Sequence, residues 1–394
     1  KAEMMTQYLS PQTLLFRVFI CLSLLTLAPL SAANGLIPRA PDVDARGYLL
    51  MDAKSGQVIV EHNAEQELPP ASLTKMMTAY LVEKEIAAGN ITEQEMVPIS
   101  VKAWRMGGSR MFIQEGTRVS VQDLLKGVVI QSGNDASVAL AEYVAGSEEA
   151  FADLMNNQAR ELGMDDTHFM NATGWPAENH YTTAHDLAIL ARAIIRDFPE
   201  HYDLYAQKEF TYNGITQHNR NLLLWRDDSV DGLKTGHTEE AGYCLVSSAK
   251  QNGMRLIAVV MGTDSEAARA RESQKLLSYG FRFYETYEGY GAGDVLDTPA
   301  VWMGAANQVR LGLEEDLILT VPKDSQDQLK ASMSIRPELR APIREGEQYG
   351  TLTVTLADET VAQRPLVALE NVEEAGFFAK IWDHVVLFFK GLFS

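Results

Sequence analysis

Basic side chains are in short supply in this sequence of 394 residues. It carries 34 lysines and arginines against 53 aspartates and glutamates, which gives a formal net charge of −19 at pH 7. Proteins that bind nucleic acids draw much of their affinity from clustered lysine and arginine side chains and from the counterions that these displace. The composition therefore argues against a nucleic-acid partner and against any other large polyanionic ligand.

Cysteine is also scarce. The sequence has only Cys21 and Cys244, and Cys21 lies in a segment that we expect to be removed, so no pair is left for an internal disulfide. Stability must therefore come from core packing. Cys244 lies in an apolar run and is predicted to be a buried hydrophobic residue rather than a reactive thiol. The histidines lack the spacings typical of zinc sites, and we expect neither a metal nor another cofactor.

The apolar run near the N-terminus is too short to cross a bilayer comfortably. Residues 16–30 carry one arginine and then about a dozen apolar residues, and the small residues Ser31-Ala32-Ala33 follow. This arrangement is typical of a secretory signal, whereas a membrane-spanning helix needs about 20 apolar residues. We therefore predict a cleaved signal peptide at residues 1–33, an exported protein and a mature chain that begins near Asn34.

Apolar residues make up 46% of the sequence, enough for two domains with cores of their own. A run of good helix formers begins at Ser72, a residue type that suits a helix cap. Helical spacing dominates residues 121–204 and 266–284. Strand character occurs toward both ends of this region, at residues 47–51, 58–61, 231–234, 243–249 and 256–261. The order predicts an α/β (α+β) domain at residues 34–290, with a sheet of N- and C-terminal strands flanked by helices.

The character of the sequence changes after about residue 290. Short alternating segments separated by proline and glycine predict a small all-β second domain at residues 291–372. Residues 373–394 are predicted to form an amphipathic helix lying in the plane of a membrane surface, the alternative being a terminal helix docked on the protein's own core. The apolar face of this helix consists of Phe377, Phe378, Ile381, Trp382, Val385, Phe388, Phe389 and Leu392.

Three short motifs follow one another along the chain: Ser72-Leu73-Thr74-Lys75, Ser132-Gly133-Asn134 and Lys234-Thr235-Gly236. Three positions apart on a helix, Ser72 and Lys75 share a face, which lets the amine approach the hydroxyl. The amine can accept a proton only when it is uncharged, which requires burial and a nearby positive charge such as Lys234. The free backbone N–H groups at the start of this helix would suit a developing oxyanion.

Each motif is a weak signal by itself, because the sequence contains chance matches. Ser247-Ser248-Ala249-Lys250 is a second SxxK and Lys54-Ser55-Gly56 is a second K[ST]G. The first ends a predicted strand and the second is a predicted hairpin turn, so we expect their side chains to face solvent. The order and context of the three motifs, with the single SxN, distinguish them from such matches. Together they are a signature of penicillin-binding proteins and class A β-lactamases.

The sequence around the motifs resembles the low-molecular-mass penicillin-binding D-alanyl-D-alanine carboxypeptidases over most of the chain. The similar stretches are residues 70–78, 131–136, 162–169 and 231–238, and the predicted β-rich domain and C-terminal helix match the layout of that family. The resemblance implies a serine-type hydrolase that removes the terminal D-alanine from peptidoglycan pentapeptides without a cofactor and that β-lactams acylate. It also implies a periplasmic protein attached peripherally to the outer face of the inner membrane.

The same resemblance implies a role for each motif residue. Ser72 would be acylated, Lys75 would deprotonate it, and Ser132 would relay a proton toward the leaving amine. The backbone N–H groups of Ser72 and His237 would form the oxyanion hole. Substrate binding would involve Asn134, Lys234, Thr235, Gly236, His237 and Arg269. Arg271 is an alternative to Arg269, because both lie in one predicted helix.

Three other functions remain open at this point. A β-lactamase would need an efficient deacylation base, but Gly133 stands where class A enzymes have aspartate and Glu161 lacks their Glu-xxx-Asn arrangement. An endopeptidase that cuts peptide cross-links would attack the same bond as a carboxypeptidase. A membrane-tethered, penicillin-sensing wall-binding protein would keep the cleft without turning over substrate.

Overall fold

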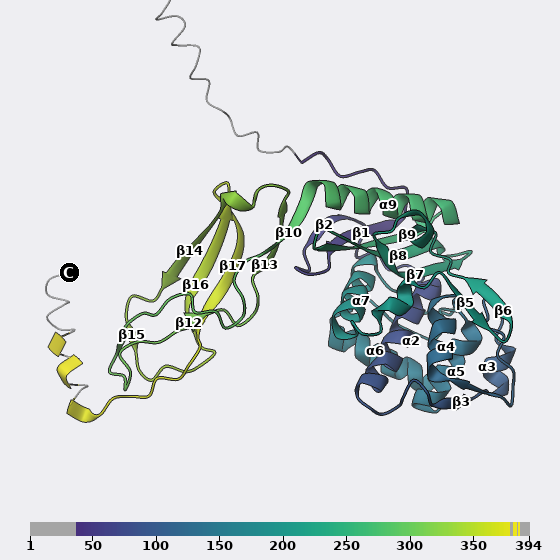
Figure 1. The fold of residues 1–394 in the computed structure, drawn as a ribbon, viewed down its shortest axis with the longest axis horizontal. Helices are drawn as coiled ribbons and strands as arrows, with labels where there is room; N and C mark the ends of the chain where they lie inside the picture. The colour runs from purple at the N-terminus through teal and green to yellow at the C-terminus, as the bar shows by residue number, and fades with distance from the viewer. Residues whose placement is uncertain (1–36, 379–380, 384, 387–394) are drawn as a thin grey trace, which may run out of the picture. The chain divides into compact units, whose positions relative to one another are not determined.

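The computed structural model describes residues 37–378, 381–383 and 385–386. The predicted signal peptide at residues 1–33 lies outside these residues. From Arg39 onward the chain belongs to one unit, which begins with helices and a five-stranded sheet and continues into a smaller β-rich region (Figure 1).

The large sheet joins strands from distant parts of the sequence. Its order is β2-β1-β9-β8-β7, and all neighbours are antiparallel. The strands are β1 (Gly47–Asp52), β2 (Val58–His62), β7 (Val230–Thr238), β8 (Gly242–Gln251) and β9 (Met254–Thr263). The N-terminal hairpin meets the C-terminal strands where β1 pairs with β9. This confirms the predicted sheet of N- and C-terminal strands.

Both faces of this sheet are covered, which explains why its central strands read as continuous apolar runs. All six residues of β1 are buried. Leu49 belongs to the core shared with the helical layer, whereas Leu50 faces α9 (Glu266–Phe283) on the other side. A Cβ atom on Gly280 of α9 would lie 2.5 Å from Leu256 Cδ1, so glycine allows the helix to approach the sheet closely. Figure 1 shows α9 on one face and α7 on the other.

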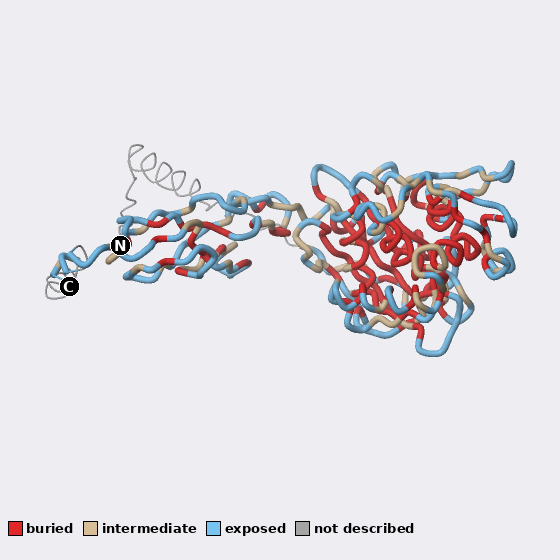
Figure 2. Tube along the Cα trace, turned by 90° about the horizontal axis from the view of Figure 1, so that it is seen from below, coloured by how far each residue is buried: buried red, intermediate tan, exposed pale blue. Residues whose placement is uncertain are grey.

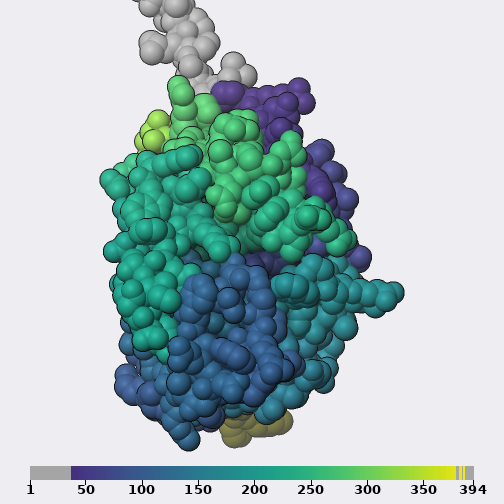
Figure 3. Space-filling view, turned by 90° about the vertical axis from the view of Figure 1, so that its right-hand side faces the viewer, coloured from purple at the N-terminus to yellow at the C-terminus, as the bar shows by residue number. Residues whose placement is uncertain are grey.

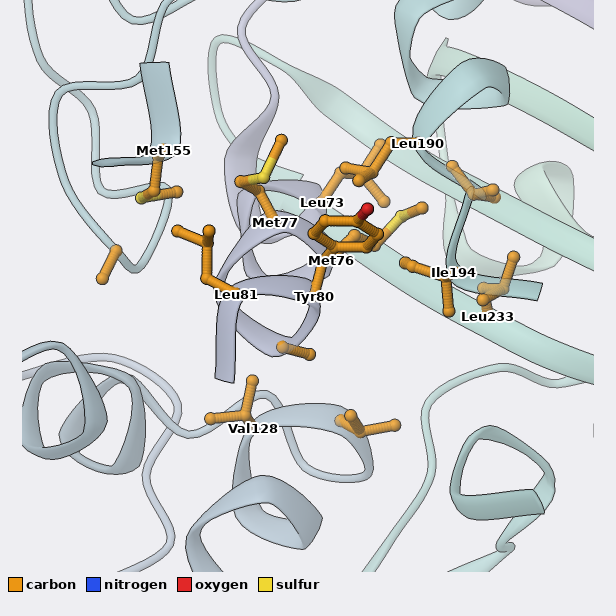
Figure 4. Close-up of a cluster of buried hydrophobic side chains, with 14 of the residues drawn as sticks. Leu73, Met76, Met77, Tyr80, Leu81, Val128, Met155, Leu190, Ile194 and Leu233 are labelled. Atoms are coloured by element: carbon orange, nitrogen blue, oxygen red, sulfur yellow. The ribbon is translucent and has the colours of Figure 1, made fainter. Parts of the chain in front are cut away.

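The helical layer is built around α2 (Lys75–Ala87), whose first nine residues are all buried. A helix that is buried all round needs apolar partners on every side. Figure 4 shows Leu73, Met76, Met77, Tyr80 and Leu81 packed among Val128, Met155, Leu190, Ile194 and Leu233. The other helices of this part of the chain are α3 (Val101–Arg105), α4 (Val121–Val129), α5 (Asn134–Ala145), α6 (Glu148–Leu162), α7 (Ala184–Asp197) and α8 (Leu223–Arg226), of which α4, α5, α6 and α7 contact α2.

Short elements complete this part of the chain. They are the 3-10 turns η1 (Ala71–Thr74) and η2 (Tyr202–Ala206), the antiparallel pair of β3 (Met96–Pro98) with β4 (Arg118–Ser120), and the hairpin of β5 (Glu209–Tyr212) with β6 (Ile215–His218). Hydroxyl caps start several helices; for example, the Ser147 and Thr183 side chains accept bonds from backbone N–H groups of α6 and α7. Ser72 does not act as the predicted cap, because Pro70 occupies that position and Ser72 lies inside η1.

The region that follows is built from strands, as predicted. β10 (Tyr284–Glu288) pairs with β13 (Ile318–Pro322), and β11 (Val301–Trp302) with β15 (Leu339–Arg340). A four-stranded sheet has the order β12 (Leu311–Gly312), β17 (Glu359–Ala368), β16 (Gln348–Leu356) and β14 (Leu329–Ile335). One 3-10 turn, η3 (Gln326–Gln328), precedes β14. Figure 2 shows buried, intermediate and exposed stretches mixed along this region, and in β16 the buried residues Tyr349, Leu352 and Val354 are separated by less buried ones.

The predicted C-terminal helix is described only in part. Residues 377–378, 381–383 and 385–386 are helical, while Phe388, Phe389 and Leu392 lie outside the described residues. The described members of the apolar face are exposed, with Phe378 at 85% and Trp382 at 69% of their accessible surface. None of the helices within 37–378, 381–383 and 385–386 has the length and apolarity needed to cross a bilayer.

Candidate active site

The first motif places a serine and a lysine on one turn. Ser72 lies in η1, half-buried, and Lys75 begins α2 with 1% of its surface exposed. Lys75 Nζ lies 3.2 Å from Ser72 Oγ. This distance places the amine within hydrogen-bonding reach of the serine oxygen. The structure therefore brings the two residues together as the spacing predicts.

Neutral oxygen atoms complete the surroundings of the Lys75 amine. Nζ also lies 2.7 Å from Asn134 Oδ1 and 2.5 Å from the Thr173 carbonyl oxygen. Burial lowers the pKa of Lys75 from 10.5 to about 7, helped by the positive charge of Arg220, while the carboxylates of Asp135 and Glu148 oppose the shift. The sequence predicts that Lys234 is the cation that lowers this pKa, whereas in the structure that cation is Arg220, which no motif indicates.

The second motif supplies Ser132 and Asn134. Ser132 is buried and has a left-handed backbone, with φ of 65°, a conformation that is uncommon outside glycine and often found at functional sites. The Ser132 hydroxyl accepts a hydrogen bond of 3.0 Å from Lys234 Nζ. Asn134 opens α5, and its amide nitrogen donates to the Gly107 carbonyl oxygen at 2.8 Å. This bond orients the Asn134 carbonyl oxygen toward Lys75.

The third motif lies on β7. Lys234 is buried and donates to Ser132 Oγ and to the Thr235 carbonyl oxygen. Burial lowers the pKa of Lys234 well below its usual value, and Lys75 and Arg220 lower it further. A Cβ atom on Gly236 would lie 3.1 Å from both the Pro70 carbonyl oxygen and Leu73 Cγ. Glycine at this position thus lets β7 lie directly beside the turn that carries the serine.

Arg269, rather than Arg271, is directed toward the site. The Arg269 guanidinium is buried, donates to the Gly236 carbonyl oxygen at 3.2 Å and lies 5.6 Å from the centre of the Tyr243 ring. Arg271 is exposed and pairs with Glu272. Next to Gly236, His237 is exposed and stacks on Tyr243 with ring centres 3.8 Å apart.

Ser72 opens on two cavities. The smaller cavity has a volume of about 300 Å³ and is lined by Ser72, Gly108, Ser109, Ser132, Arg220, Thr235, Gly236, His237, Glu266 and Arg269. The larger cavity, about 670 Å³, is lined by Ser72, Gly108, Ser109, Asn134, Thr173, Gly174, Trp175, Pro176, His237, Thr238, Glu239 and Glu240. Figure 3 shows the face on which the blue surface of the helical layer meets the green surface of the last strands and α9.

Loop residues without a motif also contribute to the site. The Asn171 side-chain oxygen accepts bonds from the backbone N–H groups of Thr173, Gly174 and Trp175 at 2.8–3.1 Å, which holds the loop that presents the Thr173 carbonyl to Lys75. The stretch Asn171-Ala172-Thr173-Gly174 carries none of the three motifs, so this loop is not among the site residues predicted from the sequence.

The prediction that both chance motif matches face solvent is wrong in part. Ser247 and Ser248 are buried inside β8, because both faces of the large sheet are covered. Ser55 is half-buried and shares a hydrogen bond of 2.6 Å with Thr320. Neither match adjoins Ser72. The prediction for Cys244 is confirmed: it is fully buried, and burial raises its thiol pKa to about 11.

The chain is similar to known proteins over nearly its whole length. A family model described as D-alanyl-D-alanine carboxypeptidase matches residues 34–265, and a model described as the C-terminal domain of penicillin-binding protein 5 matches residues 284–374. The chain is 46% identical over 375 residues to D-alanyl-D-alanine carboxypeptidase DacC of Escherichia coli strain K12, covering 93% of this chain and 94% of that protein.

Solved structures of penicillin-binding proteins are also similar to this chain. Penicillin-binding protein 5 from Haemophilus influenzae superimposes with a TM-score of 0.83 and 41% identity, covering 86% of this chain and 100% of that one. Penicillin-binding protein D2 from Listeria monocytogenes in its ampicillin-bound form matches with a TM-score of 0.57 and 30% identity, over 62% of this chain and 100% of that one.

Proposed function

Because the chain belongs to the family of D-alanyl-D-alanine carboxypeptidases, we propose that it removes the terminal D-alanine of peptidoglycan stem peptides through an acyl-enzyme on Ser72. The observation that carries this proposal is the Lys75 amine, which lies 3.2 Å from Ser72 Oγ and has its pKa lowered to about 7. An amine with this pKa is largely uncharged just above neutral pH and can take the hydroxyl proton.

The hydrogen bonds of Lys75 support its role as the base. A neutral amine has two N–H bonds and one lone pair. Asn134 Oδ1 and the Thr173 carbonyl oxygen are acceptors only, so they take the two N–H bonds. The lone pair is then left for the third neighbour, the Ser72 hydroxyl, which can donate its proton. The two acceptors thus select the orientation of the amine that the reaction needs.

The reaction that follows from this arrangement is acyl transfer. Ser72 Oγ bonds to the carbonyl carbon of the penultimate D-alanine while its proton passes to Lys75, and the oxyanion faces the backbone N–H groups of Ser72 and His237. When the C–N bond breaks, Ser132 relays to the leaving amine the proton that Lys75 took from Ser72, and D-alanine departs. Water then attacks the ester, which releases the shortened peptide and restores Ser72. A β-lactam would acylate Ser72 by the same first step.

The positive charges at the smaller cavity support one orientation of the substrate across Ser72. The smaller cavity contains Arg220 and Arg269, and Lys234 lies beside its wall residues Ser132 and Thr235. Guanidinium groups bind carboxylates well because their N–H bonds match carboxylate geometry. We place the terminal carboxylate of the substrate in this cavity, near Thr235, and the acyl part of the peptide on the other side of Ser72.

The organisation of the chain follows the same proposal: a catalytic domain at residues 34–290, a β-rich domain at 291–372 and an amphipathic membrane-anchor helix at 373–394, in an exported, periplasmic protein at the outer face of the inner membrane. The exposed Phe377, Phe378 and Trp382 support the anchor, since aromatic rings are favoured at membrane interfaces. A chain that ends at residue 372 should no longer sediment with anionic phospholipid vesicles, whereas the full chain should.

Mass spectrometry and product analysis test the catalytic proposal. Benzylpenicillin should add its mass to a tryptic peptide that contains Ser72, and D-alanine should be released from diacetyl-Lys-D-Ala-D-Ala. Ser72→Ala should lose both activities. Labelling at another residue would refute the proposal, and fast, continuous hydrolysis of benzylpenicillin would instead identify a β-lactamase. Cleavage of cross-linked dipeptides faster than of pentapeptides would identify an endopeptidase.

A further inference from the structure

Strand β14 (Leu329–Ile335) forms one edge of the four-stranded sheet in the β-rich region. It pairs with β16, and Figure 1 shows it on the outer side of β16. The free side of an edge strand presents backbone N–H and C=O groups that can pair with a further strand. The opposite edge of the sheet, β12, has only two residues, whereas β14 offers seven.

The features that usually protect an edge strand are missing from β14. Proteins prevent unwanted pairing with short edge strands, prolines, β-bulges or several charged side chains. β14 contains no proline and one charged residue, Lys330. Its pairing with β16 runs from Leu329 to Ile335 without a shift of register. The edge is therefore long and regular enough to accept another strand.

The register shows which backbone groups of β14 face the free edge. Just beyond the strand, the Arg336 N–H donates to the carbonyl oxygen of Tyr349, its partner when the register is continued. Opposed residues of an antiparallel pair alternate between hydrogen-bonded and non-hydrogen-bonded pairs. Ser332 therefore bonds to β16, while the backbone groups of Ala331 and Met333 point away from it. Within the part of the chain that the structure describes, no strand pairs with this side of β14.

One face of β14 continues the core of the β-rich region. Cross-strand partners lie on the same face of a sheet, and Ala331 and Met333 are paired with Val354 and Leu352, which are buried in that core. Met333 nevertheless has 46% of its surface exposed. The covered part of the face thus ends at β16, and an added strand would extend it over Met333.

We propose that β14 pairs with β14 of a second copy of this chain, antiparallel about a two-fold axis at Ser332. Ser332 is the central residue of the strand, so this register pairs all seven residues. The outward backbone groups of Ala331 in one copy then meet those of Met333 in the other. Ser332 faces its own counterpart in a non-hydrogen-bonded pair, as the alternation along β14 requires. The two sheets become continuous and their apolar faces lie on the same side.

The side chains of β14 are compatible with this symmetric register. Lys330 lies opposite Ser334 of the other copy, so no like charges are directly opposed, an arrangement that would be destabilising. Leu329 lies opposite Ile335, and both already pack in part against the core of the β-rich region. The pairing therefore adds apolar contacts on the core face and places small or single charged side chains on the other face.

Cysteine cross-linking tests the register directly. In the predicted mature chain, which begins near Asn34, the remaining cysteine, Cys244, is buried. Ser332→Cys places two thiols at the axis, where the Cα atoms of a non-hydrogen-bonded pair are about 4.5 Å apart, within the range of about 4.4–6.8 Å that a disulfide spans. Ser334→Cys is the matched control, because this exposed serine lies on the same face but about 14 Å along the strands from its counterpart. Mild oxidation should give at least about tenfold more disulfide-linked dimer with Ser332→Cys.

Two edge variants show whether pairing depends on β14. Ala331→Pro removes an outward N–H but no bond to β16, a change that an edge strand tolerates. Met333→Glu places a charge on the face that pairing would bury. Added to Ser332→Cys, each should lower the dimer yield to that of Ser334→Cys, while benzylpenicillin still labels Ser72 at the same rate, which shows that the chain is folded.

Three results would overturn the proposal. They are equal yields from the two cysteine variants, no dimer from either of them, and a yield that survives both edge variants. Because β14 lies outside the catalytic site, these results would leave the proposed function untouched.

Discussion

The pH dependence of Ser72 acylation tests the state of the Lys75 amine directly. The pKa of Lys75 is lowered from 10.5 to about 7, chiefly by burial. A change of this size corresponds to roughly 5 kcal/mol between the two protonation states, at about 1.4 kcal/mol per unit. At pH 7 about half of the amines would be neutral, compared with roughly one in 3,000 for an unshifted lysine.

The expected profile follows from that fraction. The second-order rate constant for acylation by benzylpenicillin should fall about tenfold per pH unit well below pH 7 and level off above about pH 8. Stopped-flow measurements at constant ionic strength would record it. A rate constant that still rises through pH 9, or one that stays flat from pH 6 to 9, would refute the assignment of Lys75 as the base.

Substitutions of nearby charged residues should move the pKa of Lys75 in predictable directions. The carboxylate of Glu148 raises the pKa of Lys75 and Arg220 lowers it, so Glu148→Gln should move the midpoint to lower pH and Arg220→Gln should move it to higher pH. Glu149→Gln is the matched control, because Glu149 also pairs with Lys102 but is exposed and does not act on Lys75. Shifts of the two test variants in one direction would contradict the electrostatic argument.

Three further predictions concern packing and burial. Gly236→Ala should keep the fold but lower kcat/KM about 10- to 100-fold, because the new Cβ would press on Pro70 and Leu73 at 3.1 Å and displace β7; unchanged kinetics would contradict this. Gly174→Ala should lower the free energy of unfolding, measured in urea, by about 2 kcal/mol more than Gly89→Ala does. Both glycines have positive φ, but of the two only Gly174 lies against another residue. Glu83 is buried, and burial raises its pKa to about 8. Because this carboxyl group loses its proton near pH 4.5 in the unfolded chain, the free energy of unfolding should fall by up to about 5 kcal/mol between pH 4.5 and 8. The fall should be smaller in Glu83→Gln.

The large sheet could be predicted because its strands are covered on both sides. Apolar runs at both ends of the region, such as those of β1 and β9, are the direct sequence consequence of that double burial. The same rule explains the error at Ser247 and Ser248, whose polar side chains suggested an exposed strand end although they are buried within β8. Small hydroxyl side chains fit a covered sheet when the backbone bonds are complete.

The side chains of the site could be anticipated from motifs, but its backbone groups could not. The Thr173 carbonyl holds Lys75, and the Gly107 carbonyl orients Asn134; every residue has such a carbonyl, so no residue type marks them. Arg220 was missed because it follows no motif. The choice between Arg269 and Arg271 needed the structure, because two positions apart on α9 they point to different sides, and only the surroundings show which side faces β7.

The parts of this catalytic centre depend on the fold to different degrees. Ser72 and Lys75 are separated by a single turn of continuous chain, so their spacing survives as long as that turn does. Ser132 and Lys234 come from segments 102 positions apart and meet only while the helical layer and the sheet stay together. Heat, denaturant or a mutation that loosens the join between these layers should therefore impair discrimination among peptides sooner than it abolishes labelling by a reactive antibiotic.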